Sequence, residues 1–308
     1  MSKVSVIVAT YNGEQTVLET LRSILTQTHQ DLELIVVDDG STDKTVEVVR
    51  AVKDSRIQLI LSKNSGSPAA PRNKGINAAT GDFIAFCDQD DLWYSEKLEK
   101  QLAAYEADAN RDDIGIIFSS ADLIDSRGTV TKSNTSRFTG FVPNTTAYPT
   151  MLNGDFIIAC SALVPKLVFD EMGELDETLL GVDDYDLWIR ILSEYGVLAL
   201  PEKLCAWRQS AGALSTDKAK QYIETENVFA KLGDTSEEIR VGHGKNLFRI
   251  FMALVLQRKF NDAQSYYAEL SDFPVSAKMN SVLRLWSVSR SLTRVWLLIL
   301  QAVGKVSL

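Results

Sequence analysis

Short apolar runs alternate with longer segments of helical spacing between residues 4 and 109, and this alternation restricts the fold more than any other feature of the chain. The strand-like runs span residues 4–10, 32–38, 57–61 and 82–88. The segments between and after them, 14–28, 45–52, 72–79 and 95–109, show helical spacing. Strands separated by helices pair in parallel, with helices on both faces of the sheet. We therefore predict an α/β fold with a mostly parallel, doubly wound sheet.

The later part of the chain changes character. Residues 114–119 form one more strand-like run, and residues 120–155 look like a hairpin followed by a long polar loop. Beyond residue 215 helical spacing continues without strand signals, so we predict an α/β domain over 1–215 and a helical region over 216–308. A basic, amphipathic pattern predicts one helix over 283–303, which either packs on the protein or a second subunit or lies on a membrane surface.

Composition excludes several classes of protein. The net charge of -9 argues against nucleic-acid binding. With only 2 histidines, a His-rich metal site or a Ser-His-Asp triad is a poor interpretation. The 3 cysteines are widely spaced in apolar runs, which is typical of buried free thiols in a reducing compartment. Neither a signal-peptide pattern nor an apolar run long enough to span a membrane is visible, so we expect a cytoplasmic protein.

Acidic residues gather where the predicted strands end. Ligands of open α/β sheets bind at the carboxyl ends of the strands. Three segments stand there: Thr10-Tyr11-Asn12, Asp38-Asp39-Gly40-Ser41 and Asp88-Gln89-Asp90-Asp91. Carboxylates this close raise one another's pKa unless a cation neutralises them. Oxygen ligands suit Mg²⁺ or Mn²⁺, which complete their coordination with water and substrate phosphates. The pattern predicts a divalent metal and a substrate that contains pyrophosphate.

Each of these segments also has an ordinary structural interpretation. Residues 38–41 could form only a turn that caps the next helix, and Asp91 fits a helix cap better than a metal ligand. Tyr11 alone would more often pack than stack on a ligand. The charges of Asp88 and Asp90 are harder to explain this way, because acids after a buried strand destabilise the protein unless something neutralises them.

Two further motifs complete the candidate site. A loop over residues 64–75 carries Arg72 into a helix, where it could hold an anion or simply begin the helix. A second acidic cluster, Asp183, Asp184 and Asp186 with Trp188 nearby, stands at the start of another helix. These acids either favour the helix dipole or include a general base. Arg208, at the end of a strand-like run, could approach a phosphate.

These motifs, in this order, resemble glycosyltransferase family 2, whose members are inverting enzymes with the GT-A fold. The resemblance covers residues 3 to 210 and implies a role for each motif. Tyr11 would stack on the nucleotide base and Asp39 would hydrogen bond to it. Asp88 would lie near the ribose and Asp90 would bind the cation, Mn²⁺ or Mg²⁺. Asp184 would be the general base.

The resemblance also implies the substrates. The donor would be a nucleotide sugar, a UDP-sugar by default with dTDP or GDP as alternatives. We expect it to be bound by Thr10, Tyr11, Asn12, Asp39, Arg72, Asp88 and Arg208. Asp38, Asp91, Asp183, Asp186 and Trp188 are weaker candidates for the site. The acceptor would be a glycan, a glycoprotein or a lipid-linked glycan of surface-polysaccharide synthesis. Ser210 departs from the pattern, because many relatives have histidine there.

Other functions fit the sequence less well. A catalytically silent nucleotide-sugar-binding module would share the fold, but the acids at 88, 90 and 184 argue for an enzyme. A sugar nucleotidyltransferase would need a glycine-rich basic loop where Tyr11–Glu14 stands. A phosphatase would place its Asp-x-Asp after an early strand, and a dehydrogenase lacks its Gly-x-Gly-x-x-Gly. We expect no nucleic-acid partner, and either a homo-oligomer or peripheral contact with the inner membrane face through the C-terminal helices.

Overall fold

The computed structural model describes residues 2–209 and 217–302. The chain divides into two compact units, which are described separately: Met1–Tyr148 with Asp155–Ala213, and Pro149–Gly154 with Leu214–Leu308. The domain boundary predicted near residue 215 and the departure at Ser210 lie outside the described residues.

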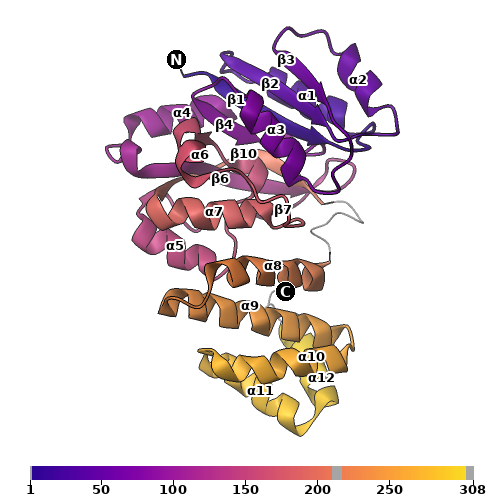
Figure 1. Cartoon of the computed structure of the whole chain (residues 1–308), viewed down its shortest axis with the longest axis vertical. Helices are drawn as coiled ribbons and strands as arrows, with labels where there is room; N and C mark the ends of the chain where they lie inside the picture. Colours follow the sequence, from indigo (N-terminus) through magenta and orange to yellow (C-terminus); the bar gives the residue numbers. More distant parts are fainter. Residues whose placement is uncertain (1, 210–216, 303–308) are drawn as a thin grey trace. The chain divides into compact units, whose positions relative to one another are not determined.

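The first unit carries the alternating elements (Figure 1). Its strands are β1 (Val4–Thr10), β2 (Leu32–Asp38), β3 (Ile57–Leu61), β4 (Phe83–Phe86), β5 (Leu92–Trp93), β6 (Ile114–Ile124), β7 (Val130–Asn134), β8 (Gly140–Val142), β9 (Val164–Pro165) and β10 (Gly196–Arg208). Its helices are α1 (Val17–Leu25), α2 (Thr45–Ala51), α3 (Ala69–Ala78), α4 (Lys97–Ala107), α6 (Lys166–Met172) and α7 (Asp183–Glu194), and α5 (Asn144–Leu152) runs across the boundary between the units.

The first sheet has the strand order β3-β2-β1-β4-β9. Its first four strands are parallel and β9 is antiparallel to β4. Helix α1 covers one face, where Val17, Leu21 and Ile24 are fully buried in the core cluster. On the other face α3 approaches β1 so closely that a Cβ on Gly75 would collide with Ile7, which explains the glycine. The predicted parallel, doubly wound α/β fold is confirmed.

A second sheet, which the sequence did not predict, has the order β5-β10-β6-β7, with β8 also paired to β10. Strands β6 and β10 are parallel, and β6 and β7 form the expected hairpin around Gly128, whose φ is 81°. The polar loop predicted up to residue 155 is wrong, because it contains β8 and α5. A three-residue strand and a helix with Pro149 inside it leave little apolar periodicity to detect.

The second unit is helical, as predicted, with α8 (Lys218–Leu232), α9 (Glu237–Leu256), α10 (Phe260–Glu269), α11 (Ala277–Val288) and α12 (Arg290–Ala302). The predicted single helix over 283–303 is wrong, because α11 ends and α12 begins on either side of Ser289. The Ser289 backbone is extended, with φ −158°, and its Oγ accepts a hydrogen bond from the N–H of Leu292 at 3.3 Å, which starts a new helix. None of the helices in the described ranges is long and apolar enough to cross a membrane.

Candidate active site

The carboxyl ends of β1, β2 and β4 meet at one edge of the first sheet. The register pairs Thr10, the last residue of β1, with Asp38, the last residue of β2. Strand β4 ends at Phe86, just before the acidic segment 88–91. Because parallel strands present their carboxyl ends together, the three segments singled out in the sequence leave the sheet at the same edge. The structure therefore brings the predicted donor-side residues together.

Asp38 is buried and organises the turn after β2. Its Oδ2 accepts hydrogen bonds from the N–H groups of Gly40 and Ser41, at 3.2 and 3.0 Å, and its Oδ1 accepts one from the Thr10 hydroxyl at 3.3 Å. Helix α2 begins only at Thr45, so the alternative of a helix cap at 38–41 is wrong. These contacts make Asp38 and Thr10 supports of the turn, and their contact with a donor stays a prediction.

Hydrogen bonds from neighbouring segments hold Tyr11 and Asn12 in place. The side chain of Gln89 makes two hydrogen bonds to Tyr11: Oε1 accepts from the N–H at 2.9 Å, and Nε2 donates to the carbonyl oxygen at 3.0 Å. Asn12 has a left-handed backbone, with φ 50°, and its Oδ1 accepts from the N–H of Thr42 at 2.8 Å. The Tyr11 ring itself remains exposed. The loop is thus held rigidly while the ring is open to a ligand.

Asp39 is buried against the loop that precedes α3. Both of its carboxylate oxygens accept from the N–H of Ser65, at 3.1 and 2.9 Å, and Oδ2 also accepts from the Ser65 hydroxyl at 2.9 Å. An ionised carboxylate has about four lone-pair positions, so acceptor capacity remains for a base. Ser65 orients Asp39, and the base contact stays a prediction.

Arg72, in the first turns of α3, joins two acids that are distant in sequence. Its Nη2 lies 2.5 Å from Asp88 Oδ1 and its Nη1 lies 2.8 Å from Asp183 Oδ2. Arg72 and Asp183 are both buried, whereas the Asp88 side chain is partly exposed. The guanidinium therefore ties the acidic segment after β4 to the start of α7. This arrangement makes one site from the two acidic clusters of the sequence.

Asp90 and Asp91 follow Asp88 with different surroundings. Burial, and then the charge of Asp88, raise the pKa of Asp90 to about 6, while the charge of Arg208 acts in the opposite direction. Asp91 is buried, and its Oδ1 accepts from the backbone N–H of Arg208 at 2.8 Å. The expected cap of α4 by Asp91 is wrong, because α4 begins at Lys97, beyond β5. Asp91 instead binds the end of β10 to this segment.

Arg208 is buried at the end of β10 and supports the acidic segment. Its Nε donates to the carbonyl oxygen of Asp90 at 2.6 Å, Nη1 donates to the carbonyl oxygen of Asp125 at 3.2 Å, and Nη2 lies 2.9 Å from Glu19 Oε2 on α1. All three guanidinium nitrogens thus have a protein partner. These contacts make Arg208 a support of the segment, and its predicted contact with a phosphate stays a prediction.

Asp184 lies at the start of α7, next to Asp183. Burial, and then the charges of Asp183 and Asp155, raise the pKa of Asp184 to about 8. The charge of Arg72 and a hydrogen bond from the N–H of Tyr185, 2.9 Å from Asp184 Oδ1, act in the opposite direction. A carboxyl group with a raised pKa beside a cationic side chain is typical of a proton acceptor in a site.

Asp186 and Trp188 have structural contacts on α7. Asp186 is buried, and its Oδ2 lies 2.9 Å from Nε of Arg190, one turn along the helix. Trp188 is fully buried, and its Nε1 is the one buried side-chain nitrogen or oxygen without a hydrogen-bond partner among the residues that the structure describes. These contacts place both side chains in the packing of α7, and their part in the site stays a prediction.

The acids after β4 fit a divalent cation. Asp88 and Asp90 are two residues apart, and burial, followed by the charge of Asp88, raises the pKa of Asp90; a bound cation would favour its ionised form. Within the ranges 2–209 and 217–302, no three His, Cys, Asp or Glu side chains form a complete metal cluster. Mg²⁺ and similar cations are commonly bound by one or two carboxylates, with substrate phosphates and water completing the shell. The residues present suit that kind of binding.

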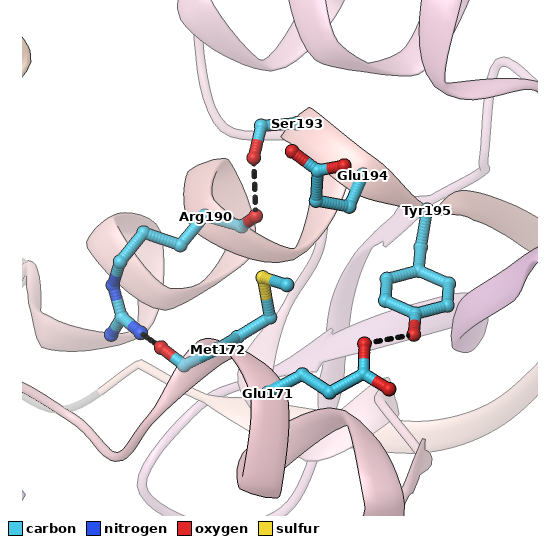
Figure 2. Close-up of a pocket in the computed structure, with 6 residues that line it drawn as sticks. All are labelled: Glu171, Met172, Arg190, Ser193, Glu194 and Tyr195. Atoms are coloured by element: carbon cyan, nitrogen blue, oxygen red, sulfur yellow. Dashed lines mark hydrogen bonds between the residues drawn. The ribbon is translucent and has the colours of Figure 1, made fainter.

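A hollow of about 570 Å³ lies elsewhere on the first unit (Figure 2). Six residues line it, from α6, from α7 and at position 195. Most of them already bind one another. Tyr195 OH donates to Glu171, Ser193 Oγ donates to the Arg190 carbonyl, and Arg190 donates to the Met172 carbonyl. Arg190 stands two turns along α7 from Asp183, about 10 Å at 1.5 Å per residue. The candidate site therefore does not coincide with this hollow.

Several contributors to the site were not predicted from the sequence. Gln89 stands inside the acidic motif, and nothing in the sequence indicates that its side chain binds the Tyr11 backbone. The Thr20 hydroxyl lies 2.9 Å from the carbonyl oxygens of both Gln89 and Asp91, which share its one hydrogen. The available signal for Thr20 was a hydroxyl on the buried face of α1, which is otherwise apolar. Ser65 and Glu19 gave no signal, because their partners lie far away along the chain.

Comparison with solved structures gives the fold class. The structure of S. aureus TarS 1-349 in complex with UDP-GlcNAc matches with a TM-score of 0.70 and 20% identity, over 98% of this chain and 92% of that one. The mannosyltransferase PcManGT from Pyrobaculum calidifontis, in complex with GDP-Man and Mn²⁺, matches with a TM-score of 0.62 and 19% identity, over 99% and 87%. The fold is thus GT-A.

The sequence comparisons give the family. The model of glycosyl transferase family 2 matches residues 5–164. Two Escherichia coli proteins named UDP-Glc:alpha-D-GlcNAc-diphosphoundecaprenol beta-1,3-glucosyltransferase are each 31% identical: WfaP over 76% of this chain and 88% of its own length, and WfgD over 71% and 81%. A Rickettsia felis glycosyltransferase is 36% identical over 68% of this chain, which spans 34% of that longer protein. The chain belongs to glycosyltransferase family 2 and is a glycosyltransferase.

Proposed function

We propose that the protein transfers a sugar from a UDP-sugar to a hydroxyl group of a lipid-linked glycan, with inversion at the anomeric carbon. The bridge from Asp88 through Arg72 to Asp183 carries the proposal, because it sets the donor-side acids beside the candidate base Asp184. The names of the two Escherichia coli relatives support the class of donor and acceptor. The UDP-GlcNAc complex of TarS supports a UDP-sugar as well.

The donor would lie along the edge formed by β1, β2 and β4. The exposed ring of Tyr11 is free to stack on the base, and Asp39, oriented by Ser65, would accept a hydrogen bond from the base. Arg72 would lie near the phosphates and Asp88 near the ribose. Mn²⁺ or Mg²⁺, held by Asp90, would neutralise charge on the departing nucleoside diphosphate.

Asp184 would accept the proton of the acceptor hydroxyl. As that proton leaves, the acceptor oxygen attacks the anomeric carbon from the face opposite the leaving group, and the bond to the diphosphate oxygen breaks. One displacement inverts the anomeric configuration. The raised pKa makes Asp184 a stronger base than an ordinary carboxylate, which favours this proton transfer.

Transfer to a synthetic GlcNAc-diphosphate lipid tests the proposal. We expect Asp184→Asn to lower kcat by about 10²–10⁴-fold, the usual contribution of a general base, without loss of UDP binding. Asp170→Asn, which removes an exposed acid on α6, is the matched control and should leave kcat unchanged. Transfer by Asp184→Asn at the wild-type rate would exclude Asp184 as the base.

Thermal unfolding with nucleoside diphosphates, with and without EDTA, tests the donor side. We expect UDP with Mn²⁺ or Mg²⁺ to raise the unfolding temperature of the wild-type protein, and Asp90→Asn to lose this shift. A shift with UDP but no hydrolysis or transfer of any UDP-sugar would support a silent binding module of the same fold. We place the protein at the cytoplasmic membrane face, where a lipid-linked acceptor would be reached.

A further inference from the structure

The last two helices of the second unit leave an apolar stripe uncovered. Helix α12 buries Thr293 and Leu297, and Leu297 joins the core of the unit. The stripe consists of Val288, Leu292, Val295 and Leu298, which are 81%, 56%, 50% and 40% exposed. On α12, Leu292, Val295 and Leu298 recur every three residues, which places them on one side of the helix, and Val288 is the last residue of α11, just before the break at Ser289. Single exposed apolar residues need no explanation, but three on one side of a helix, with a fourth at the end of the preceding helix, mark a contact surface.

Positive charge accompanies this stripe. Residues 277–302 contain Lys278, Arg284, Arg290 and Arg294 and no aspartate or glutamate, in a chain with a net charge of -9. Arg284 and Arg290 are exposed, and the Arg290 guanidinium lies 5.4 Å from the centre of the Trp286 ring. The segment that carries the stripe is therefore basic, which is opposite in sign to the net charge of the chain as a whole.

The charge decides between the two occupants that an apolar stripe could have. A second copy, docked face to face, would bring the same arginines against one another, and like charges across an interface oppose association. An anionic bilayer offers hydrocarbon to the stripe and phosphates to the arginines. Amphipathic helices with this distribution of side chains lie in the plane of such surfaces.

We propose that the exposed apolar side of α12, with the end of α11, binds an anionic lipid bilayer, so that Val288, Leu292, Val295 and Leu298 lie at the boundary of headgroups and acyl chains. The inference rests on the proposed lipid-linked acceptor for its purpose, since a substrate anchored in a bilayer is reached from the bilayer surface. The binding itself needs neither donor nor acceptor and is measured without them.

Flotation of the full chain with vesicles tests this inference. We expect the protein to float with vesicles of equal parts phosphatidylglycerol and phosphatidylcholine, and at least about tenfold less with phosphatidylcholine alone. The stripe variant Leu292→Gln/Val295→Gln/Leu298→Gln should lose at least about tenfold in partitioning. The control variant Leu61→Gln/Val130→Gln/Leu167→Gln, whose side chains are each just over half exposed on the first unit, should bind as the wild type does.

The basic residues are tested separately. Arg284→Gln and Arg290→Gln should each weaken binding to the anionic vesicles about fivefold, and added salt should weaken the wild type further. All of the substituted residues are exposed, so the thermal unfolding of every variant should match that of the wild type.

Three results would overturn the inference. The first is a wild-type protein that ignores anionic vesicles, and the second is a control variant that loses as much binding as the stripe variant. The third is a wild-type dimer, seen by light scattering without vesicles, that the stripe variant dissociates. Vesicle binding without any glycosyl transfer would support the inference while the proposed function fails. Glycosyl transfer without vesicle binding would support the proposed function and overturn the inference.

Discussion

Arg72 and Asp183 form a buried ion pair, with Nη1 and Oδ2 2.8 Å apart, between residues 111 positions apart in the chain. The pair holds the first turns of α3 against the start of α7. Through the same guanidinium, Asp88 after β4 is joined to the start of α7.

Removal of the positive side chain from this ion pair should destabilise the fold. Arg72→Met leaves Asp183 buried without its partner, so we expect a loss of about 3–5 kcal/mol in the free energy of unfolding, measured in urea. Lys100→Met breaks an exposed pair with Glu96 next to the start of α4 and should change the free energy of unfolding far less. Equal losses for the two variants would show that burial adds nothing to the Arg72–Asp183 pair.

The pH dependence of transfer should report Asp184. A general base acts when deprotonated, and burial together with Asp183 and Asp155 raises the pKa of Asp184 to about 8, against the charge of Arg72. We therefore expect kcat/KM to fall as the pH falls below about 8. Asp155→Asn removes one of the charges that raise this pKa, so the acidic limb should move to lower pH. A limb that stays in place would contradict the electrostatic link between Asp155 and Asp184.

Arg208 should affect donor binding by holding the acidic segment. Arg208→Lys keeps the charge but cannot reach Glu19 and the carbonyl of Asp90 together with one ammonium group. We expect KM for the donor to rise about tenfold, since the acidic segment would lose one of its supports and small displacements of positioning groups weaken substrate binding. The matched variant Glu19→Gln changes the exposed partner and should alter KM little. A larger effect of Glu19→Gln would indicate that Glu19 itself contacts the donor.

The helical unit contains a histidine that should make its stability depend on pH. His243 lies 3.0 Å from both Glu226 and Asp234, its ring stacks on Phe229, and Glu269 adds a further acid nearby. Burial would lower the pKa of His243, but the two carboxylate partners raise it above 6.5 overall. The protonated ring therefore stabilises the folded unit fully below pH 6.5, the ordinary pKa of histidine. This stabilisation is lost as the pH rises through the higher pKa of His243 in the folded state.

We expect the unfolding temperature of this unit to fall between pH 6 and 8.5, and His243→Gln to remove most of that dependence. Calorimetry of the full chain at both values measures it. His29→Gln, in the first unit, is the control and should leave the dependence as in the wild type, whereas an unchanged His243→Gln profile would assign the effect to other groups.

The acidic motifs were predictable because parallel strands bring their carboxyl ends to one edge of the sheet. Residues that directly follow such strands are therefore candidates for a ligand site. Their partners were not. Arg208 and Glu19 are 189 positions apart, and no periodicity links them. Asp91 illustrates the same limit: a local rule indicated a helix cap, but a backbone N–H from β10 binds its carboxylate. The break at Ser289 was missed because the apolar pattern continues unchanged through the point where the backbone becomes extended.

The two hydrogen bonds between Gln89 and the Tyr11 backbone have a thermodynamic consequence. They fasten the loop proposed for base stacking to the segment proposed for cation binding, so neither can shift without breaking bonds to the other. Under the proposed function, a base that settles against Tyr11 would also fix the position of Asp90. Affinity for the nucleoside and affinity for the metal would then form one linked equilibrium, in which each ligand strengthens the binding of the other by the same factor.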